Sequence, residues 1–338
     1  MTQGSQRSLV TGGCGFVGRA LVDALLARGD AVSVLDHAGD AWRDDMTLIR
    51  ADLRDAAAVD AAIAGADAVF HSASLVHTKA SRESLVRAVN IDGAHNVLAA
   101  CQRGGVTRLI YVSSASVVYD GHDIRGGDET MPYPDRFPAL YAETKAIAER
   151  ALLAADGAQG VKTVSIRPHV VFGPGDTRLV PAILSRARAG KLKFRVGSDA
   201  KRSDFTYVGN VVQALLLADE RLQGGAPIGG QAYFITNGEP RSFWDFVGRI
   251  VEAVGYARPR FEIPYGVAYA AATVRELFDT LVRGGTLHAE EGLSRFAIRY
   301  LCTDHYFSHA KATRDLGYVP ETNLDEGIAR TVASLARA

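Results

Sequence analysis

The sequence has no excess of charge of either sign, no long apolar run and few cysteines. Among its 338 residues, Lys plus Arg and Asp plus Glu each count 38, so no basic surplus attracts a phosphate backbone. The longest uncharged apolar stretch with helical character, residues 264–274, is well short of the roughly 20 residues that cross a bilayer. We therefore expect no nucleic-acid partner and no transmembrane helix.

The N-terminal residues lack the apolar segment of a secretory signal, and the cysteines form no C-x-x-C pair. An odd set of three, Cys14, Cys101 and Cys302, indicates neither a disulfide framework nor a zinc site. Small buried apolar side chains are the simpler interpretation of all three. These absences predict a cytoplasmic protein without a bound metal.

The first half of the chain alternates short β-branched runs with longer segments rich in Ala and Leu. This alternation predicts an α/β fold, a Rossmann-type doubly wound parallel sheet covered by helices. Strands are expected at residues 8–11, 31–36, 47–51, 68–71, 108–113 and 163–167. Helices are expected at residues 16–28, 55–64, 83–102 and 141–155.

The regular alternation breaks after Arg167, where prolines and glycines follow within eight residues. We predict a dinucleotide-binding domain over residues 1–168 and a smaller, mixed C-terminal substrate lobe over residues 169–338, parts of which return to the first domain. Helices in this later region are expected at residues 181–189, 210–218, 242–254, 267–281 and 324–335, and strands at residues 232–236 and 260–263. The lobe should close over the carboxyl ends of the strands, where such sheets bind ligands.

A glycine-rich loop, residues 11–18, joins the first expected strand to the first helix with G-x-x-G-x-x-G spacing. Glycine permits the tight turn and brings the backbone close to a pyrophosphate, whose charge the free N–H groups and the helix N-terminus stabilise. A turn that needs glycine only for packing is the alternative. The predicted cofactor-binding residues of this loop are Gly12, Gly15, Phe16, Val17 and Gly18.

Asp36 ends the second expected strand, 18 residues after Gly18. An acidic side chain there accepts hydrogen bonds from the ribose hydroxyls and repels a 2′-phosphate, which predicts NAD rather than NADP. A solvated aspartate at a strand end is the alternative. His37 could weaken the discrimination, and Arg43 could reach a phosphate if its loop folds back.

Weaker signals extend the cofactor site along the sheet. Asp52 follows the third expected strand and could accept from the adenine amino group, with Leu53 packing on the ring. The small residues around Ala73 let the cofactor lie close to the backbone after the fourth strand. His71 is interpreted as a strand-end histidine rather than a catalytic one.

Tyr141 and Lys145 lie four residues apart, hence on one face of one expected helix. A phenol has a pKa of about 10, but a neighbouring ammonium favours the phenolate and turns it into a usable base. Lys145 can also hold a ribose hydroxyl. A solvated Tyr/Lys face is the alternative, which the place of this pair after the fifth expected strand disfavours.

Ser114 is the candidate that orients the substrate oxygen by a hydrogen bond. It lies at the end of the fifth expected strand, at the sheet edge where ligands bind. Ser113 and Ser116 compete for this role, and a serine that caps a turn is the simpler alternative.

Together these features resemble the extended short-chain dehydrogenases/reductases, over nearly the whole chain. Further matching segments are residues 90–96, 167–176 and 204–208, although Ala94 stands where the family has threonine. The resemblance implies that Asn90 and Pro168 contact the cofactor and that His169 joins Ser114 and Tyr141 at the substrate. It also implies a homodimer built from the helices at residues 83–102 and 141–155.

Within that superfamily the chain is most similar to 3β-hydroxysteroid dehydrogenases and to sterol-4α-carboxylate 3-dehydrogenases of the decarboxylating type. The segments that carry this likeness are residues 113–118, 126–133, 140–145, 232–240, 263–269 and 315–320. It implies NAD-dependent oxidation of the 3β-hydroxyl of a steroid or sterol, including a 4α-carboxysterol that then loses CO2. The sterol-carboxylate enzymes carry a longer apolar segment after residues 263–265, whereas Arg275 and Glu276 interrupt it here. The helix at residues 267–281 therefore admits an apolar substrate, contacts a membrane surface weakly, or belongs to the core of the lobe.

Three other functions remain open at this point. A 2-alkyl-3-oxoalkanoate reductase uses the same pair of β-hydroxy and β-keto acids on alkyl chains. A nucleotide-sugar epimerase or dehydratase shares Ser114, Tyr141 and Lys145 and needs arginines, which the later region contains. A non-catalytic sensor of NAD(P) would not need both the tyrosine and the lysine.

Overall fold

The computed structural model describes residues 5–76, 82–283 and 294–335 of the chain. Within these ranges one sheet contains seven strands, all paired in parallel. These strands are β1 (Arg7–Thr11), β2 (Ala31–Asp36), β3 (Met46–Arg50), β4 (Ala68–His71), β5 (Arg108–Val112), β7 (Lys162–Pro168) and β11 (Gln231–Ile235). The first six confirm the strands predicted in the first half of the chain to within one or two residues.

The strand order β11-β7-β5-β4-β1-β2-β3 makes the sheet doubly wound. The chain runs outward from β1 to β3, returns to β4 beside β1, and continues outward on the other side. The switch point therefore lies between β1 and β4, and their carboxyl ends open into the crevice where such folds bind ligands. This confirms the predicted fold class.

The helices outnumber the strands of the sheet in the described part of the chain. They are α1 (Phe16–Arg28), α2 (Ala56–Ile63), α3 (Glu83–Arg87), α4 (Gly93–Gly104), α5 (Leu140–Ala154), α6 (Leu179–Arg188), α7 (Val208–Gln223), α8 (Phe243–Ala253), α9 (Tyr265–Arg283), α10 (Arg295–Leu301), α11 (Ala310–Leu316) and α12 (Leu324–Leu335). Of these, α10 and α11 were not predicted, because seven residues are too few to show a helical period.

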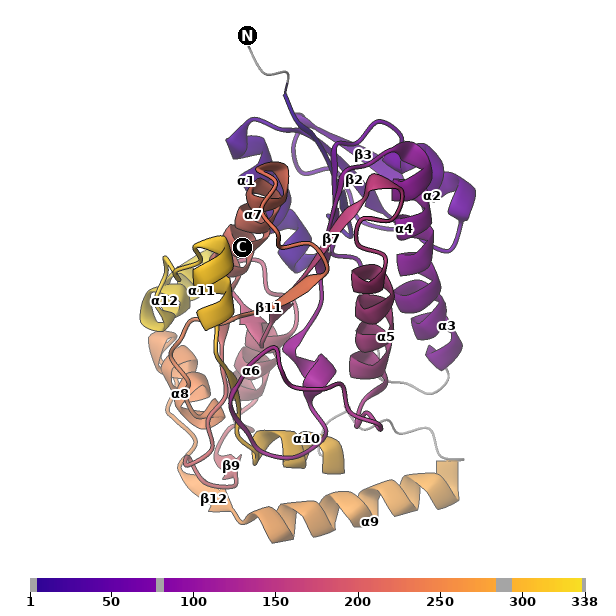
Figure 1. Cartoon of the computed structure of the whole chain (residues 1–338). Coiled ribbons are helices and arrows are strands. Elements are labelled where there is room, and N and C mark those ends of the chain that lie inside the picture. The colour runs from indigo at the N-terminus through magenta and orange to yellow at the C-terminus, as the bar shows by residue number, and fades with distance from the viewer. Residues whose placement is uncertain (1–4, 77–81, 284–293, 336–338) are drawn as a thin grey trace.

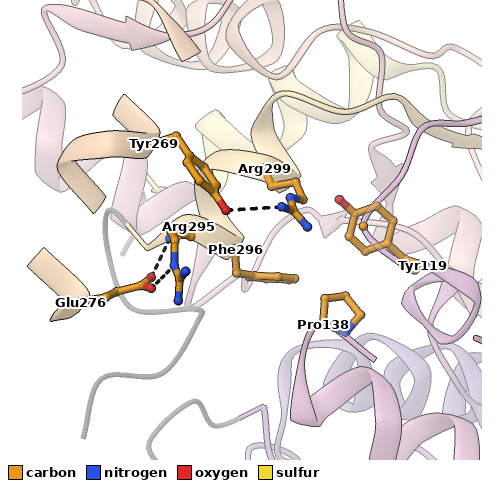
Figure 2. A pocket seen from close by; sticks show the side chains of 8 residues that line it. Tyr119, Pro138, Tyr269, Glu276, Arg295, Phe296 and Arg299 are labelled. Atoms are coloured by element: carbon orange, nitrogen blue, oxygen red, sulfur yellow. Dashed lines mark hydrogen bonds and ion pairs between the residues drawn. The ribbon is translucent and has the colours of Figure 1, made fainter. Parts of the chain in front are cut away.

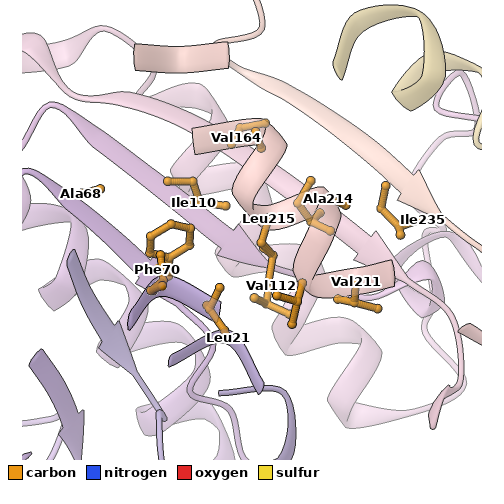
Figure 3. Close-up of a cluster of buried hydrophobic side chains, with 14 of the residues drawn as sticks. Leu21, Ala68, Phe70, Ile110, Val112, Val164, Val211, Ala214, Leu215 and Ile235 are labelled. Carbon is orange, nitrogen blue, oxygen red and sulfur yellow. The ribbon is translucent and has the colours of Figure 1, made fainter. Parts of the chain in front are cut away.

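Alternate residues of the strands enter two cores, one on each face of the sheet. Phe70 and Ile110 face α1 and α7, as Figure 3 shows, and α11 adds Leu316 to that core. Val69 and Leu109 face α2, α4 and α5 on the other side. Each strand is thus buried on both faces, which is why the strands read as continuous apolar runs.

The expected helix at residues 83–102 contains one irregular turn. Between α3 and α4 the segment Ala88–Asp92 is π-helical, so the prediction of one regular helix was wrong in this detail. Gly93 follows it, and a Cβ there would lie 2.9 Å from Leu53 Cβ, so a larger residue would push the helix away from Leu53. The wide turn carries Asn90.

The later part of the chain both builds the second lobe and returns to the sheet. The strand predicted at 232–236 is β11, which extends the main sheet beside β7, and α7 packs on the same sheet. A separate core joins α6, α8 and α12 around Phe172 and Phe246. Short parallel pairs complete the lobe: β6 (Ile124–Gly127) with β13 (His305–Phe307), β8 (Val171–Phe172) with β10 (Thr206–Tyr207), and β9 (Phe194–Val196) with β12 (Phe261–Ile263).

The long helix α9 lies across one end of the molecule, beside α10 (Figure 1). Of its described side chains, those of Ala268 and Ala272 are buried, in a stripe that packs against Ile298 of α10. Val274 and Leu277 are 68% and 58% exposed, so most of this helix is not lobe core. Among the described helices none is both long and apolar enough to cross a membrane.

Candidate active site

The glycine loop after β1 forms a cradle that side chains would fill. Gly12 has a φ of +69°, and a Cβ on it would lie 2.6 Å from the Cα of Ala73, beyond β4. A Cβ on Gly18 would lie 2.2 Å from the carbonyl oxygen of Gly12. Gly15 caps α1 without a side-chain hydrogen bond, so the first-turn amides have no side-chain acceptor. This arrangement fits the pyrophosphate of a dinucleotide.

The remaining predicted loop residues, Phe16 and Val17, begin α1 and are partly buried. Both pack against the core of the second lobe, and a Cβ on Gly175 would be 3.8 Å from the Phe16 ring. Their contact with a cofactor stays a prediction.

Asp36 is the last residue of β2 and points back to the glycine loop. Its carboxylate accepts a hydrogen bond from the Cys14 amide at 3.0 Å, and its side chain is 11% exposed. His37 Nδ1 lies 3.3 Å from it. Arg43 instead pairs with Asp45, so its guanidinium already has an anionic partner. The position suits an acceptor for ribose hydroxyls.

The predicted adenine contacts lie beside β3. Asp52 forms an ion pair with Arg54, at 2.6 Å, and is partly exposed. Leu53 is buried and packs into the core under α4. The Leu53 side chain thus has core partners already, and the roles of both residues toward adenine stay predictions.

Asn90 connects the crevice to helix α5. Its Oδ1 accepts from the Leu75 amide at 2.7 Å, and its Nδ2 donates to the Leu75 carbonyl and to Thr144 Oγ1, each at 3.0 Å. With both amide hydrogens used, Asn90 fixes the chain after β4 against α5. A direct contact with the cofactor stays a prediction.

Helix α5 places Tyr141 at its first turn and Lys145 one turn further. Lys145 is 1% exposed, and its Nζ donates to the Val112 carbonyl at 2.5 Å. The same Nζ lies 4.1 Å from the centre of the Tyr111 ring. Burial lowers the pKa of Lys145 to about 7, although the Glu149 carboxylate on the next turn opposes the shift.

Ser114 caps the short 3₁₀ turn that follows β5. Its Oγ accepts from the Ser116 amide at 3.2 Å and lies 2.9 Å from Ser116 Oγ. Ser113 is buried, so of the three serines it is the least able to reach a substrate. Ser114 caps a turn and is also partly exposed. The turn cap is therefore observed, and the contact with a substrate oxygen stays a prediction that this exposure allows.

A buried network beneath this site was not predicted from the sequence. Glu149 accepts from Arg167 Nη2 at 2.7 Å, from Ser165 Oγ at 2.5 Å and from the Tyr133 hydroxyl at 2.7 Å. Arg167 holds the pKa of the Glu149 carboxyl below its usual range despite full burial. The four-residue spacing from Lys145 to Glu149 is the signal that could have revealed it.

A second buried pair lies at the end of β4. His71 Nδ1 is 2.7 Å from Thr11 Oγ1, and its ring stacks beside that of Tyr111. Burial lowers the pKa of His71 to about 3, so the ring is neutral. His71 is therefore a packed strand-end histidine in this structure.

Pro168 ends β7 at the crevice, and His169 follows it. Pro168 pairs with Ile235 of β11, and its predicted contact with the cofactor remains untested. His169 is buried, with Nε2 2.8 Å from Nδ1 of His305 and 3.3 Å from Ser203 Oγ. Burial lowers the pKa of both histidines, which favours their neutral forms. One ring therefore donates a hydrogen bond to the other. The substrate contact of His169 stays a prediction.

A cavity of about 430 Å³ opens between α10 and the segments on either side of β6, and Tyr269 and Glu276 of α9 also line it (Figure 2). Tyr119 follows the 3₁₀ turn capped by Ser114, and Pro138 lies three residues before Tyr141. Two segments that border the cavity thus adjoin Ser114 and Tyr141 along the chain. Phe296 and Arg299 of α10 also line the cavity.

No cluster of three or more His, Cys, Asp or Glu side chains with metal-binding geometry occurs within the ranges that the structure describes. Cys14, Cys101 and Cys302 are all free thiols, and burial raises the pKa of Cys101 to about 12.

Comparison with protein families gives one match over most of the chain. A model described as the 3-beta hydroxysteroid dehydrogenase/isomerase family matches residues 9–265. The 2-alkyl-3-oxoalkanoate reductase of Stenotrophomonas maltophilia is 42% identical over 97% of this chain and 99% of its own length. The decarboxylating sterol-4-alpha-carboxylate 3-dehydrogenase of Homo sapiens is 38% identical over 98% of this chain and 88% of its length. The 3 beta-hydroxysteroid dehydrogenase/Delta 5→4-isomerase of Mycobacterium tuberculosis is 39% identical over 93% of this chain and 86% of its own length.

Solved structures agree on the fold. The Thermus thermophilus UDP-glucose 4-epimerase, in complex with NAD, is 27% identical with a TM-score of 0.73, covering 98% of this chain and all of that one. An epimerase of Methanothermobacter thermautotrophicus is 22% identical with a TM-score of 0.78, covering 98% of this chain and 93% of that one.

Proposed function

Because the chain belongs to the 3-beta hydroxysteroid dehydrogenase/isomerase family, a branch of the extended short-chain dehydrogenases/reductases, we propose that it oxidises the 3β-hydroxyl of a steroid or sterol to a ketone. The chain is an NAD-dependent oxidoreductase that acts on CH–OH groups. The observation that carries the proposal is the pair Tyr141 and Lys145 at the start of α5, with Lys145 buried against the Val112 carbonyl at the end of β5.

NAD fits the residues of the crevice. The loop between Gly12 and Gly18 leaves room for a pyrophosphate at the N-terminus of α1, and Asp36 at the end of β2 accepts from the adenosine ribose. When bound, NAD supplies the acceptor for the hydride that leaves the carbinol carbon. The Asp36 carboxylate would also repel a 2′-phosphate, which favours NAD over NADP.

Tyr141 Oη takes the proton of the substrate hydroxyl. The Lys145 ammonium makes this transfer easier, because a positive charge near the phenol stabilises the phenolate. The Ser114 hydroxyl donates to the substrate oxygen and holds it against Tyr141. Lys145 is kept in place by the Val112 carbonyl and by the ring of Tyr111, so the charge is positioned before substrate enters.

A substrate with a carboxylate at C4 extends the reaction. Oxidation at C3 converts such a β-hydroxy acid into a β-keto acid, which loses CO2 because the new carbonyl stabilises the enolate that remains. No separate decarboxylating residue is required. A 4α-carboxysterol therefore belongs to the substrates that we propose.

Reduction of a 2-alkyl-3-oxoalkanoate is the second candidate. The observation that favours it is the S. maltophilia reductase, which matches 99% of its own length at 42% identity. Its substrate is also a β-keto acid, with the carboxylate on the carbon next to the reacting carbonyl. The two candidates thus differ in the hydrocarbon and share the reacting group.

The test is NADH formation at 340 nm with NAD and a panel of 3β-hydroxysteroids, 4α-carboxysterols and 2-alkyl-3-hydroxyalkanoates. We expect turnover of the sterol substrates, and turnover of the alkanoates alone would transfer the assignment to the second candidate. No turnover of any panel member would contradict both. Scattering at micromolar concentration measures the proposed homodimer, which a monomeric mass would exclude.

A further inference from the structure

The cavity beside Tyr119 combines aromatic walls with two arginines (Figure 2). Tyr119, Phe296 and Tyr269 supply ring faces, which suit a hydrocarbon skeleton. The rings of Tyr119 and Phe296 belong to the same apolar cluster as Ala146, the residue after Lys145 on α5. The cavity wall is therefore continuous with the helix that carries the proposed catalytic pair.

The two arginines differ in their partners. Arg295 is neutralised by Glu276, to which both its backbone amide and its guanidinium donate. In the described part of the chain the Arg299 guanidinium donates to the Tyr269 hydroxyl at 3.4 Å, a long hydrogen bond, and a second phenol, Tyr265, lies near it. Within the described ranges no carboxylate pairs with Arg299. The Arg299 side chain is exposed, so its charge is hydrated, and among the described residues no carboxylate occupies it.

Figure 2 shows where this cation points. The Arg299 side chain extends from α10 toward Tyr119, above the ring of Phe296 and on the side of the cavity away from Glu276. A planar fork of donors in this position matches a carboxylate, which it can bind through two hydrogen bonds.

We propose that Arg299 is a specificity-determining residue that binds the carboxylate of an apolar β-hydroxy or β-keto acid. The inference rests on the proposed function, and it narrows the substrate class from secondary alcohols in general to acids. Among the proposed substrates, 4α-carboxysterols and 2-alkyl-3-oxoalkanoates carry such a carboxylate, whereas a neutral 3β-hydroxysteroid leaves the guanidinium without an anion. The aromatic walls bind the hydrocarbon, and the single positive charge selects its acidic head.

The experiment compares each acid with its methyl ester, which keeps the hydrocarbon and removes the negative charge. The probes are a 3β-hydroxy-4α-carboxysterol and a 2-alkyl-3-hydroxyalkanoate, assayed for NADH formation with the wild type and Arg299→Gln. Arg258→Gln is the matched control, because it removes one positive charge from an exposed arginine on a segment outside the cavity. Arg299→Lys keeps the charge and loses the fork.

We expect the wild type to prefer the acid over its ester by more than 10-fold in kcat/KM. Arg299→Gln should lower kcat/KM for the acid by about 10- to 100-fold, mainly through KM, and leave the ester unchanged. The kcat/KM of Arg299→Lys for the acid should lie between those of the wild type and Arg299→Gln. Arg258→Gln should have the same kcat/KM as the wild type. Equal use of acid and ester by the wild type, or an acid preference that survives Arg299→Gln, overturns the inference.

A binding measurement separates this inference from the proposed function. If neither acid nor ester is turned over, the proposed function fails, and calorimetric titration of the same acids then tests the cavity alone. Binding of the acid that weakens 10-fold or more in Arg299→Gln supports the carboxylate site. Equal binding to both proteins, or no binding to either, overturns it.

Discussion

Replacing Lys145 with methionine should stabilise the protein without cofactor at low pH while removing the charge that the proposed reaction needs. Lys145 is almost fully buried, and burial lowers its pKa from 10.5 to about 7. In the unfolded chain the same amine keeps its ordinary pKa. Below pH 7 the ammonium is therefore charged in both states, and its burial destabilises the fold.

The magnitude follows from the displacement of the pKa. At about 1.4 kcal/mol per pKa unit, the ammonium costs about 5 kcal/mol at pH 6. The sign is set by proton binding: between pH 7 and 10.5 the unfolded state holds more protons, so stability rises with pH and the cost falls to about 2 kcal/mol at pH 9. Methionine removes this cost but leaves the Val112 carbonyl without its donor, a loss of about 1–3 kcal/mol.

Urea unfolding of the two proteins without NAD at pH 6 and pH 9 measures the effect. Lys145→Met should be more stable than the wild type by about 2–4 kcal/mol at pH 6, with an advantage about 3 kcal/mol smaller at pH 9. Lys162→Met, at an exposed lysine of β7, is the control and should change stability by less than about 0.5 kcal/mol at either pH. An advantage that is independent of pH, or a variant less stable than the wild type at pH 6, would refute the reasoning.

Three further predictions test other parts of the account. Gly18→Ala should weaken NAD binding by at least about 10-fold in calorimetry, because its Cβ would collide with backbone, whereas Gly266→Ala, with nothing within 4 Å, should leave NAD binding unchanged. Asp36→Ala should raise kcat/KM with NADP relative to NAD by at least about 10-fold, and an unchanged ratio would contradict the ribose contact. Glu149→Gln should lower the free energy of unfolding by about 3–5 kcal/mol, because Arg167 would remain buried without its anion. Glu83→Gln, which removes the exposed ion pair between Glu83 and Arg87, should lower it by less than about 1 kcal/mol. Equal losses for the two variants in urea unfolding would contradict this prediction.

The sequence alone predicts the parts of the fold that depend on local periodicity. The first six strands and helices such as α1 and α5 show continuous apolar runs or helical spacing, and the glycine loop has its own turn chemistry. The pairing of β11 with β7 could not be read in this way, because the hydrogen bonds of a parallel strand connect residues far apart in the chain. The two-residue strands β8 and β10 are too short to have a period at all.

The same distinction holds within the candidate site. Tyr141 and Lys145 are visible as a pair because four residues is one helical turn, and Glu149 repeats that spacing. The pairing of Glu149 with Arg167 of β7 depends on the tertiary fold. Arg299 reaches the cavity from a segment far along the chain from Tyr119, so no local pattern marks it.

The most direct test of the account is the effect of Tyr141→Phe on turnover and on NAD affinity, measured on the same preparation. If the phenol accepts the substrate proton, removing one oxygen atom should lower kcat by about a thousandfold while the dissociation constant for NAD stays within about threefold. A variant that retains a tenth or more of the wild-type kcat would show that the proton leaves by another route.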